Sequence, residues 1–577
     1  MATIQPKTTN GHKYWYIVES KRINGKPRPV VLEYLGKADD LLKRLHGVKG
    51  PCKLKSYSHG LVAKLLDVAS SLDICHVLNG FVCSERKYTS EKPIRNHLTV
   101  GASLMLAALG RACAVTSKEG WSQWARTTSL AYLLRTNFSK VDSQHFWDTM
   151  DAFPAQAIEE AELQILRNTL RHYSIKMDSL FYDTTNFYTY INTTNSKCHI
   201  AKRGKNKQKR MDLRQIGLAL VVTKDDMIPL FHYSYEGNMN DAKVFASVIG
   251  KIKDRLTAIG ANLQNHTLVF DRGNNSRKNI DMVESAGMKY VGALTPFHHK
   301  ELVAEATSRL EETVVGDKTI LTYKTSKNIW GHDITVVVTI SDKLKEGQIQ
   351  GIYTSLANCD AAISKLNQML SNPRGKKRTR ENIETLVQSI ISRYKVQHLI
   401  EFNVLQDDEK CYGISHVIKY ENLAKLEEDM GYRILMTNNH SWSIQEIVQT
   451  YHGQSYIENT FKNMKNQQHL SLNPQYHWTD QKIKVNNFCC VLAYLMTSLI
   501  YKTAREKGFT GSMDTLLDKL GNIRLGTIVE DTGKKGRPKA VYQIEEMDPS
   551  EKKLAEDLQI IDLHKKPIKP KGLSVYI

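Results

Sequence analysis

Residues 177–191 read MDSLFYDTTNFYTYI, and they open the part of the chain in which strands replace helices. A basic stretch follows, and residues 215–238, QIGLALVVTKDDMIPLFHYSYEGN, predict two strands around a turn at Asp225 and Asp226. The pattern then predicts a helix over 242–259, a strand over 266–271, a helix over 278–286 and a strand over 290–295. Hairpin strands that give way to alternating strands and helices predict a mixed sheet covered by helices.

The segments on either side of this region have other patterns. Near the N-terminus, residues 14–36 predict two strands around a tight turn at Asn24 and Gly25, and residues 57–171 have the apolar spacing of long helices. The strands predicted after residue 297 are 334–340, 348–356 and 431–438, and the helices are 361–370, 381–394, 443–468, 480–501 and 550–558. Because the regular alternation of strands and helices is lost in the region 298–432, the sequence predicts an inserted unit there.

Composition narrows the class of partner. The 577 residues are 41% hydrophobic and 24% charged, which is ordinary for a folded globular chain and argues against wholesale disorder or a coiled-coil rod. Lys and Arg number 80 against 60 Asp and Glu, so the net charge of +20 favours a polyanion, either nucleic acid or an anionic membrane surface. Nine scattered cysteines without a C-x-x-C pair support neither a zinc ribbon nor a disulfide framework.

No membrane span is expected. The longest apolar stretches, 98–109 and 488–501, are shorter than the ~20 residues that cross a bilayer. The N-terminal sequence MATIQPKTTN has no apolar signal core, so the predicted location is the cytoplasm.

Two aspartates follow apolar strand patterns. Asp183 ends the run LFYD, and Asp271 ends LVFD before Arg272, so both are expected at strand ends, where α/β sheets keep their sites. Carboxylates that hold magnesium can activate an oxygen nucleophile and polarise a phosphate. Taken singly, an acid at a strand end is more often a solvated cap or turn former.

A third carboxylate, Glu458, lies in a predicted helix that begins with the capping box of Ser443 and Glu446. At 100° per residue, one face of this helix, about 60° wide, carries Tyr451, Gln454, Glu458 and Lys465. Alone, Glu458 would more often be an exposed helix residue paired with Lys462.

The segment YHGQSYIENTFKNMK, residues 451–465, resembles the Tyr, Arg, Glu, Lys signature of bacterial insertion-sequence transposases of the DDE type. Upstream, 177–188 resembles the family's first-aspartate strand and 268–276 its second. Residues 235–241, YEGNMND, resemble the Gly-Asn-x-x-Asp element, and 431–438 the strand before the glutamate helix. The blocks stand in family order over about 176–500, with room for an insertion before the glutamate.

The resemblance implies a ribonuclease H-like core in which Asp183, Asp271 and Glu458 hold two divalent ions, normally Mg²⁺, with Mn²⁺ as a possible substitute. It implies a transposase that cuts phosphodiester bonds at element ends and joins the 3′ hydroxyl to target DNA. It implies double-stranded DNA as partner, and a homodimer that synapses two ends in a prokaryotic, nucleoid-associated setting. Whether second-strand cleavage uses a hairpin stays open.

The same resemblance carries over three DNA contacts, Tyr451, Lys465 and the position of Gln454. Gln454 departs from the pattern, because the family usually has Arg there. Glutamine can donate a hydrogen bond but lacks the cationic fork of arginine. The departure bears on how strongly the element end is bound, not on metal binding.

The fold class that follows is multidomain α+β and α/β, with a ribonuclease H-like mixed-sheet catalytic core interrupted by an α/β insertion. The expected parts are 1–48, a β-hairpin unit; 49–170, a helical DNA-binding domain; 171–297, the first part of the core; 298–432, the insertion; 433–502, the second part of the core with the glutamate helix; and 503–577, a C-terminal tail region.

Basic segments fit a DNA path. Seven Lys or Arg lie between 202 and 214, including the candidate DNA contacts Lys209 and Arg210, and Arg272 is a further candidate. Five more lie in 374–380, and Arg537 with Pro538 resembles a minor-groove hook. Most such runs are solvated loops.

Two other functions compete with the transposase. One is a ribonuclease H-like endonuclease that cuts without joining. The other is a catalytically silent DNA-binding protein descended from a transposase, which the Gln454 departure would suit. The three carboxylates argue against the silent protein. A protein that only binds DNA has no need for three convergent carboxylates, whose mutual repulsion raises their pKa values when no metal is bound.

Overall fold

A computed structural model describes residues 2–23, 26–45, 52–82, 97–204, 210–372, 378–406, 412–530, 539–565, 568 and 570–573. The chain divides into two compact units, Met1–Ala152 with Ile500–Ile577, and Phe153–Leu499.

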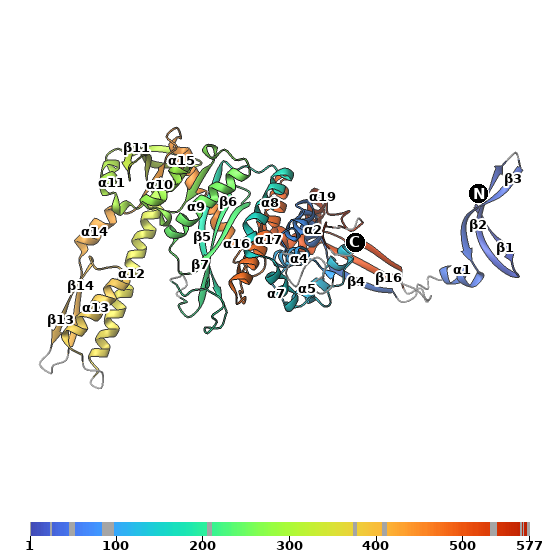
Figure 1. The fold of residues 1–577 in the computed structure, drawn as a ribbon, viewed down its shortest axis with the longest axis horizontal. Coiled ribbons are helices and arrows are strands. Elements are labelled where there is room, and N and C mark those ends of the chain that lie inside the picture. The colour runs from blue at the N-terminus through green and yellow to red at the C-terminus, as the bar shows by residue number, and fades with distance from the viewer. Residues whose placement is uncertain are drawn as a thin grey trace. The chain divides into compact units, whose positions relative to one another are not determined.

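The second unit is built on one nine-stranded sheet, with the strand order β10-β11-β12-β15-β9-β8-β5-β6-β7. Figure 1 shows β5, β6 and β7 side by side in this sheet. The strands are β5 (Ser179–Thr189), β6 (Arg214–Thr223), β7 (Pro229–Glu236), β8 (Thr267–Phe270), β9 (Lys289–Leu294), β10 (Glu311–Val315), β11 (Lys318–Ile329), β12 (His332–Ile340) and β15 (Tyr432–Thr437).

The sheet is mixed, as the sequence predicted. β5, β6 and β7 pair antiparallel, and the turn between β6 and β7 contains Asp225 and Asp226. β8 joins β5 in parallel and β9 joins β8 in parallel. From β9 onward, β15, β12, β11 and β10 follow in antiparallel pairs. The protein is thus a mixed α+β chain with a large mixed sheet.

The second unit also contains helices. They are α8 (Ile158–His172), α9 (Asp241–Ala258), α10 (Arg277–Ser285), α11 (Lys300–Thr307), α12 (Asp342–Leu370), α13 (Arg380–Tyr394), α14 (Tyr420–Glu428), α15 (Ile444–His452), α16 (Gln454–Asn463) and α17 (Asp480–Glu506). Single 3₁₀ turns are η2 (Ala155–Ala157), η3 (Leu263–Asn265), η4 (Arg272–Asn274) and η5 (Pro296–His298).

Alternation along β5 decides which helix meets which face. The ring of Tyr182 lies 4.9 Å from that of Phe245 on α9, so even-numbered positions face α9. The ring of Phe181 lies 5.8 Å from that of Tyr456 on α16, so odd-numbered positions face α16. Because successive side chains of a strand point to opposite faces, Asp183 belongs to the α16 face.

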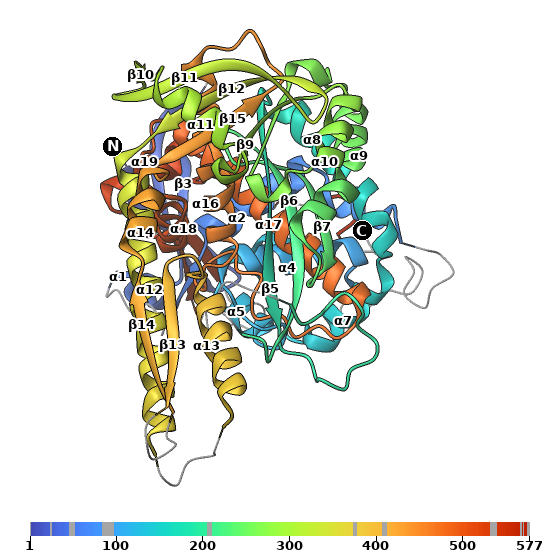
Figure 2. The ribbon, with the colours of Figure 1, turned by 90° about the vertical axis from the view of Figure 1, so that its left-hand side faces the viewer.

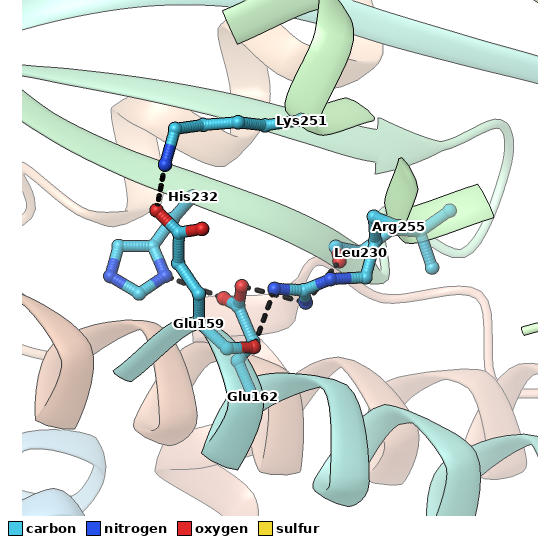
Figure 3. Close-up of polar contacts among 6 residues, drawn as sticks. All are labelled: Glu159, Glu162, Leu230, His232, Lys251 and Arg255. Carbon is cyan, nitrogen blue, oxygen red and sulfur yellow. Dashed lines mark hydrogen bonds and ion pairs between the residues drawn. The ribbon is translucent and has the colours of Figure 1, made fainter. Parts of the chain in front are cut away.

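A buried ionic cluster fixes α8 against the far edge of this sheet (Figure 3). Glu162 of α8 accepts from Nη1 of Arg255 at 2.8 Å and lies 2.5 Å from Nδ1 of His232 on β7. Arg255 also donates to the backbone oxygens of Leu230 and Glu159. All three charged or titratable side chains of this cluster are nearly fully buried, so α8, β7 and α9 are held as one block.

In the region 298–432, one predicted strand is wrong, and further strands and helices are present that were not predicted. Residues 348–356, expected as a strand, lie inside α12, a helix of 29 residues. Its buried positions, Leu356, Cys359, Ile363 and Leu366, have helical spacing and pack on α13, β13 (Ile400–Gln406), β14 (Tyr412–Ile418) and α14 (Figure 2). The run 348–356 contains Ile, Tyr and Thr, which favour a strand, but the helically spaced apolar residues from Leu356 onward favour a helix, and the helix forms.

The long helix expected over 443–468 is also corrected. It is broken at Gly453 into α15 and α16, although the predicted capping box of Ser443 and Glu446 is present at its start. A Cβ built on Gly453 would lie 2.5 Å from Cζ of Phe181, so only glycine lets the chain approach β5 this closely. The face shared by residues 451–465 on one continuous helix therefore does not exist.

The first unit contains two three-stranded antiparallel sheets and a set of helices. One sheet is β1 (Ala2–Thr9), β2 (His12–Ile23) and β3 (Lys26–Gly36); the other is β17 (Lys539–Ile544), β16 (Arg524–Glu530) and β4 (Cys52–Ser58). The helices are α1 (Ala38–Leu45), α2 (Gly60–Ser71), α3 (Ile74–Asn79), α4 (Val100–Cys113), α5 (Trp121–Arg126), α6 (Leu130–Leu134), α7 (Ser143–Ala152), α18 (Met513–Asn522) and α19 (Pro549–Asp557). The predicted turn residues Asn24 and Gly25 lie outside the described residues.

Among the residues that the structure describes, one helix, α17, is long and apolar enough to cross a membrane by length and composition. It is longer than the apolar run seen in the sequence. Its apolar window is 94% buried inside the protein, which is the placement of a core helix.

Candidate active site

Asp183 lies in the middle of β5, not at a strand end as predicted. Residues 184–189 continue the strand because each pairs with a residue of β6, and Asp183 itself is opposite Leu220. The polar run TTN, which suggested an end, is accommodated because this part of the strand is only partly buried.

Asp271 directly follows β8, as predicted for a strand end. The last parallel pair of β5 and β8 is Tyr182 with Phe270, so Asp183 and Asp271 are the next residues on neighbouring strands. Neighbouring strands lie about 4.8 Å apart. Two carboxylates that are 88 residues apart in sequence (271 − 183) thus reach the same level of the sheet.

Both aspartates are held in the same way. Oδ1 of Asp183 accepts the backbone N–H of Thr184 at 2.7 Å, and Oδ1 of Asp271 accepts that of Arg272 at 2.7 Å. Each contact ties one carboxylate oxygen to its own backbone, which limits the side-chain rotamers.

Glu458 is an exposed residue of α16 and shares a cavity with Asp271. The cavity has a volume of about 550 Å³, within the range of ligand sites. Its lining consists of Asp271, Arg272, Ala293, Leu294, Pro296, Leu344, Gln348, Tyr432, Arg433, Tyr451, His452, Gln454, Ser455 and Glu458. Two carboxylates and two guanidinium groups therefore line one cavity.

Asp183 is not among the residues that line this cavity. Within the described ranges, no group of three or more His, Cys, Asp or Glu side chains is close enough to hold a metal ion. The sequence-predicted trio is thus brought together only in part: Asp183 with Asp271 by strand register, and Asp271 with Glu458 by the cavity.

Contacts on both sides of Glu458 nevertheless fix α16 over the Asp183 face of β5. Before it, Gly453 and Tyr456 pack on Phe181. After it, Nζ of Lys465 donates to Oγ1 of Thr185 at 2.5 Å and lies 5.3 Å from the centre of the Phe187 ring. Lys465 lies beyond the end of α16 and does not line the cavity. Its contacts with Thr185 and Phe187 hold it against β5.

Tyr451 is 8% exposed and lines the cavity together with its charged residues. Burial and Asp271 raise the pKa of its hydroxyl while Arg433 and Arg272 lower it, and the net pKa is about 12. The phenol is therefore a neutral hydrogen-bond donor at ordinary pH. Gln454 lines the same cavity, in spite of the helix break.

The other predicted DNA contacts have different settings. Arg272 lines the cavity. Arg210 is exposed and forms a bidentate pair with Asp212, with bonds of 2.8 and 2.7 Å. Lys209, most of the basic run at 374–380, and Arg537 with Pro538 lie outside the described residues.

Asp241 is a further acidic residue beside Asp183 that the sequence signature does not assign. Asp241 begins α9, and its Oδ1 accepts from Oγ1 of Thr184, next to Asp183, at 2.9 Å. Burial raises the pKa of Tyr182, and Tyr235, Asp183 and Asp241 raise it further, so both carboxylates lie near this phenol. The signal was the last position of YEGNMND.

Comparison with known proteins gives two matches. A family model described as the transposase DDE domain matches residues 180–496. A solved structure, described as the cryo-EM structure of the piggyBac transposase synaptic complex with hairpin DNA, is similar over 80% of this chain and 79% of that chain, at 7% sequence identity and a TM-score of 0.34. No curated protein matches the chain.

Proposed function

The chain belongs to the family of transposases with a DDE domain, and from this membership we propose that it is the transposase of a bacterial insertion sequence. Its reaction is the cleavage of phosphodiester bonds at the ends of the element, followed by joining of the freed 3′ hydroxyl to target DNA. The branch proposed is the one with the Tyr, Arg, Glu, Lys signature, here with Gln454 at the arginine position.

The observation that carries the proposal is the register of β5 and β8, which sets Asp183 and Asp271 side by side. The strand order β7-β6-β5-β8-β9, antiparallel up to β5 and parallel after it, supports a ribonuclease H-like core. The packing of α16 on the odd-numbered face of β5 supports Glu458 as the third carboxylate.

The donor set fits divalent cations, because DDE transposase domains use such ions and carboxylate oxygens are the ligands that Mg²⁺ and Mn²⁺ prefer. Asp183, Asp271 and Glu458 would hold two ions, which lower the pKa of water or of a 3′ hydroxyl and stabilise the leaving oxygen. The three carboxylates are not a closed cluster, so the proposal requires them to draw together when DNA and cations bind.

The chain's own residues have three tasks in this reaction. The N–H groups of Thr184 and Arg272 keep the two aspartates oriented. The contact of Lys465 with Thr185 ties the segment after the glutamate helix to the aspartate strand. Tyr451, held neutral by burial, donates a hydrogen bond to a phosphate oxygen near the scissile bond.

The proposed partners are double-stranded DNA, at both element ends and target, and a second copy of the chain in a synaptic complex. The net charge of +20 supports the DNA partner, and Lys209 and Arg210 are proposed to contact its backbone. The six-part division of the chain, with DNA binding in 49–170, and a cytoplasmic, nucleoid-associated location belong to the same proposal.

The test is to incubate the purified full chain with Mg²⁺ and labelled duplexes taken from the DNA on both sides of its gene. We expect cut and strand-transfer products that disappear in Asp183→Ala, Asp271→Ala and Glu458→Ala. Cut products without joined products would favour the endonuclease. Tight binding without any product would favour the silent DNA-binding protein, and equal products from the triple variant would refute the site.

A further inference from the structure

Arg433 is a cation of the cavity that the sequence signature does not contain. It is the second residue of β15, where it pairs with Thr339 of β12, so its backbone is fixed inside the large sheet. Its guanidinium lies 5.8 Å from the centre of the Tyr451 ring and lines the same cavity as Asp271 and Glu458. β15 thus places a positive charge in the cavity that Glu458 of α16 also lines.

Among the described parts of the chain, one hydrogen bond of the Arg433 guanidinium is found. Nη1 lies 3.2 Å from Nε2 of His452, and since arginine only donates, the imidazole accepts. The pKa of His452 is lowered by partial burial, by Arg433 and by Lys318, which agrees with a neutral ring. Among the described residues, neither Arg433 nor Arg272 has a carboxylate within ion-pair distance.

Tyr451, Arg272 and Arg433 line the same cavity. Burial raises the pKa of the Tyr451 hydroxyl overall, and both guanidinium groups act against that rise. The arrangement combines two cations, each with a planar fork of donors, and one neutral O–H donor. Such a set suits a tetrahedral dianionic or monoanionic oxygen ligand better than it suits an apolar one.

We propose that Arg433, Arg272 and the Tyr451 hydroxyl form a phosphate-binding site beside Asp271 and Glu458, and that Arg433 supplies from β15 the cation that Gln454 lacks. The ligand of this site is a phosphate of the DNA strand. The choice of DNA as the ligand rests on the proposed function. A phosphate responds to where a charge lies in space, not to its position in the sequence. The departure at Gln454 is thereby compensated by a residue 21 positions upstream (454 − 433).

The experiment measures the affinity of the full chain for the flanking-DNA duplexes over a series of salt concentrations, without divalent cations. Each phosphate contact by a cation contributes about −0.9 to the slope of log K against log salt. We expect Arg433→Ala to weaken binding roughly tenfold to a hundredfold and to remove about one such unit of slope. In the Arg433→Ala background, Gln454→Arg is expected to restore the slope.

The matched control is Arg393→Ala, which removes an exposed arginine of α13 that does not line the cavity. If Arg433→Ala behaves like this control, the inference is wrong. A double variant that stays at the lower slope would refute the substitution of Arg433 for the missing arginine. Arg433→Lys keeps the charge within the sheet and serves if the alanine variant does not fold; it should keep the slope and bind more weakly, and a lower slope would overturn the inference.

Cleavage with Mg²⁺ is measured on the same duplexes in parallel. A wild-type chain that never cuts them contradicts the proposed function, while the salt slopes still decide on the phosphate site. Conversely, a wild-type chain that cuts, with slopes equal in Arg433→Ala and Arg393→Ala, contradicts the phosphate site alone.

Discussion

Nζ of Lys465 donates a hydrogen bond of 2.5 Å to Oγ1 of Thr185, two residues after Asp183 on the same face of β5. The residue that follows the glutamate helix is therefore bound to the strand of the first aspartate. The contact connects the strand that carries Asp183 to the segment that follows α16, which carries Glu458.

We predict that Lys465 and Thr185 contribute to the free energy of unfolding as a coupled pair. Lys465→Ala and Thr185→Val should each lower the free energy of unfolding, and a double-mutant cycle should give a coupling energy of about 0.5–1.5 kcal/mol. Lys465→Ala should also slow DNA cleavage more than Thr185→Val, because the lysine additionally contacts the Phe187 ring. Urea unfolding and a cleavage assay measure the two effects, and a coupling energy of zero would contradict the contact.

The adjacent aspartates give a second prediction. Asp183→Asn and Asp271→Asn preserve shape but remove a charge that a cation requires, so cleavage should fall by roughly a hundredfold or more in each. Asp254→Asn is the control, since Asp254 is an exposed residue of α9 that does not line the cavity. Wild-type rates in either site variant would rule that aspartate out as a ligand.

Stability should depend strongly on Glu162. Glu162→Gln leaves Arg255 buried without its carboxylate, and we expect a loss of about 3–5 kcal/mol in the free energy of unfolding. Glu159→Gln on the same helix breaks only a surface pair with Lys251 and should cost less than about 1 kcal/mol. Urea unfolding of both variants provides the comparison, and equal losses would show that the buried cluster has no special role.

The Glu162 cluster also predicts a pH dependence. Burial raises the pKa of Glu162, but His232 and Arg255 outweigh it, so the folded-state pKa lies below the ordinary value of 4.5. A lowered carboxylate pKa gives stability that is present above the unfolded value and is lost as the pH falls below about 4.5. Glu162→Gln should therefore lose less stability than the wild type between neutral and acid pH; parallel curves would argue against this linkage.

Tyr451 predicts the opposite dependence at high pH. Its folded-state pKa of about 12 lies above the ordinary value of 10, so its contribution to stability is full below pH 10 and is lost as the pH rises toward 12. Compared with Tyr451→Phe, the wild type should lose up to about 2 kcal/mol more over this interval. Ultraviolet titration of the phenol, with unfolding measured at each pH, tests this, and an ordinary tyrosine pKa would contradict it.

Much of the core was predictable because its signals are local. The β6–β7 hairpin, β8 with Asp271 at its end, α9, α10, and the capping box at Ser443 are all set by apolar period and turn chemistry within a few residues. The errors have a different origin. The placement of Asp183 depends on pairing with β6, the helix break depends on Phe181 beneath Gly453, and the long α12 depends on packing against α13.

The sequence by itself determined the family, because three carboxylates, a tyrosine and a lysine stand in blocks that follow the family's order, and this order does not depend on how the chain folds. Only the tertiary structure decided which charges share a cavity. Arg433 had no signal in the sequence, because strand pairing joins positions that no local pattern connects and electrostatic forces act through distance in space.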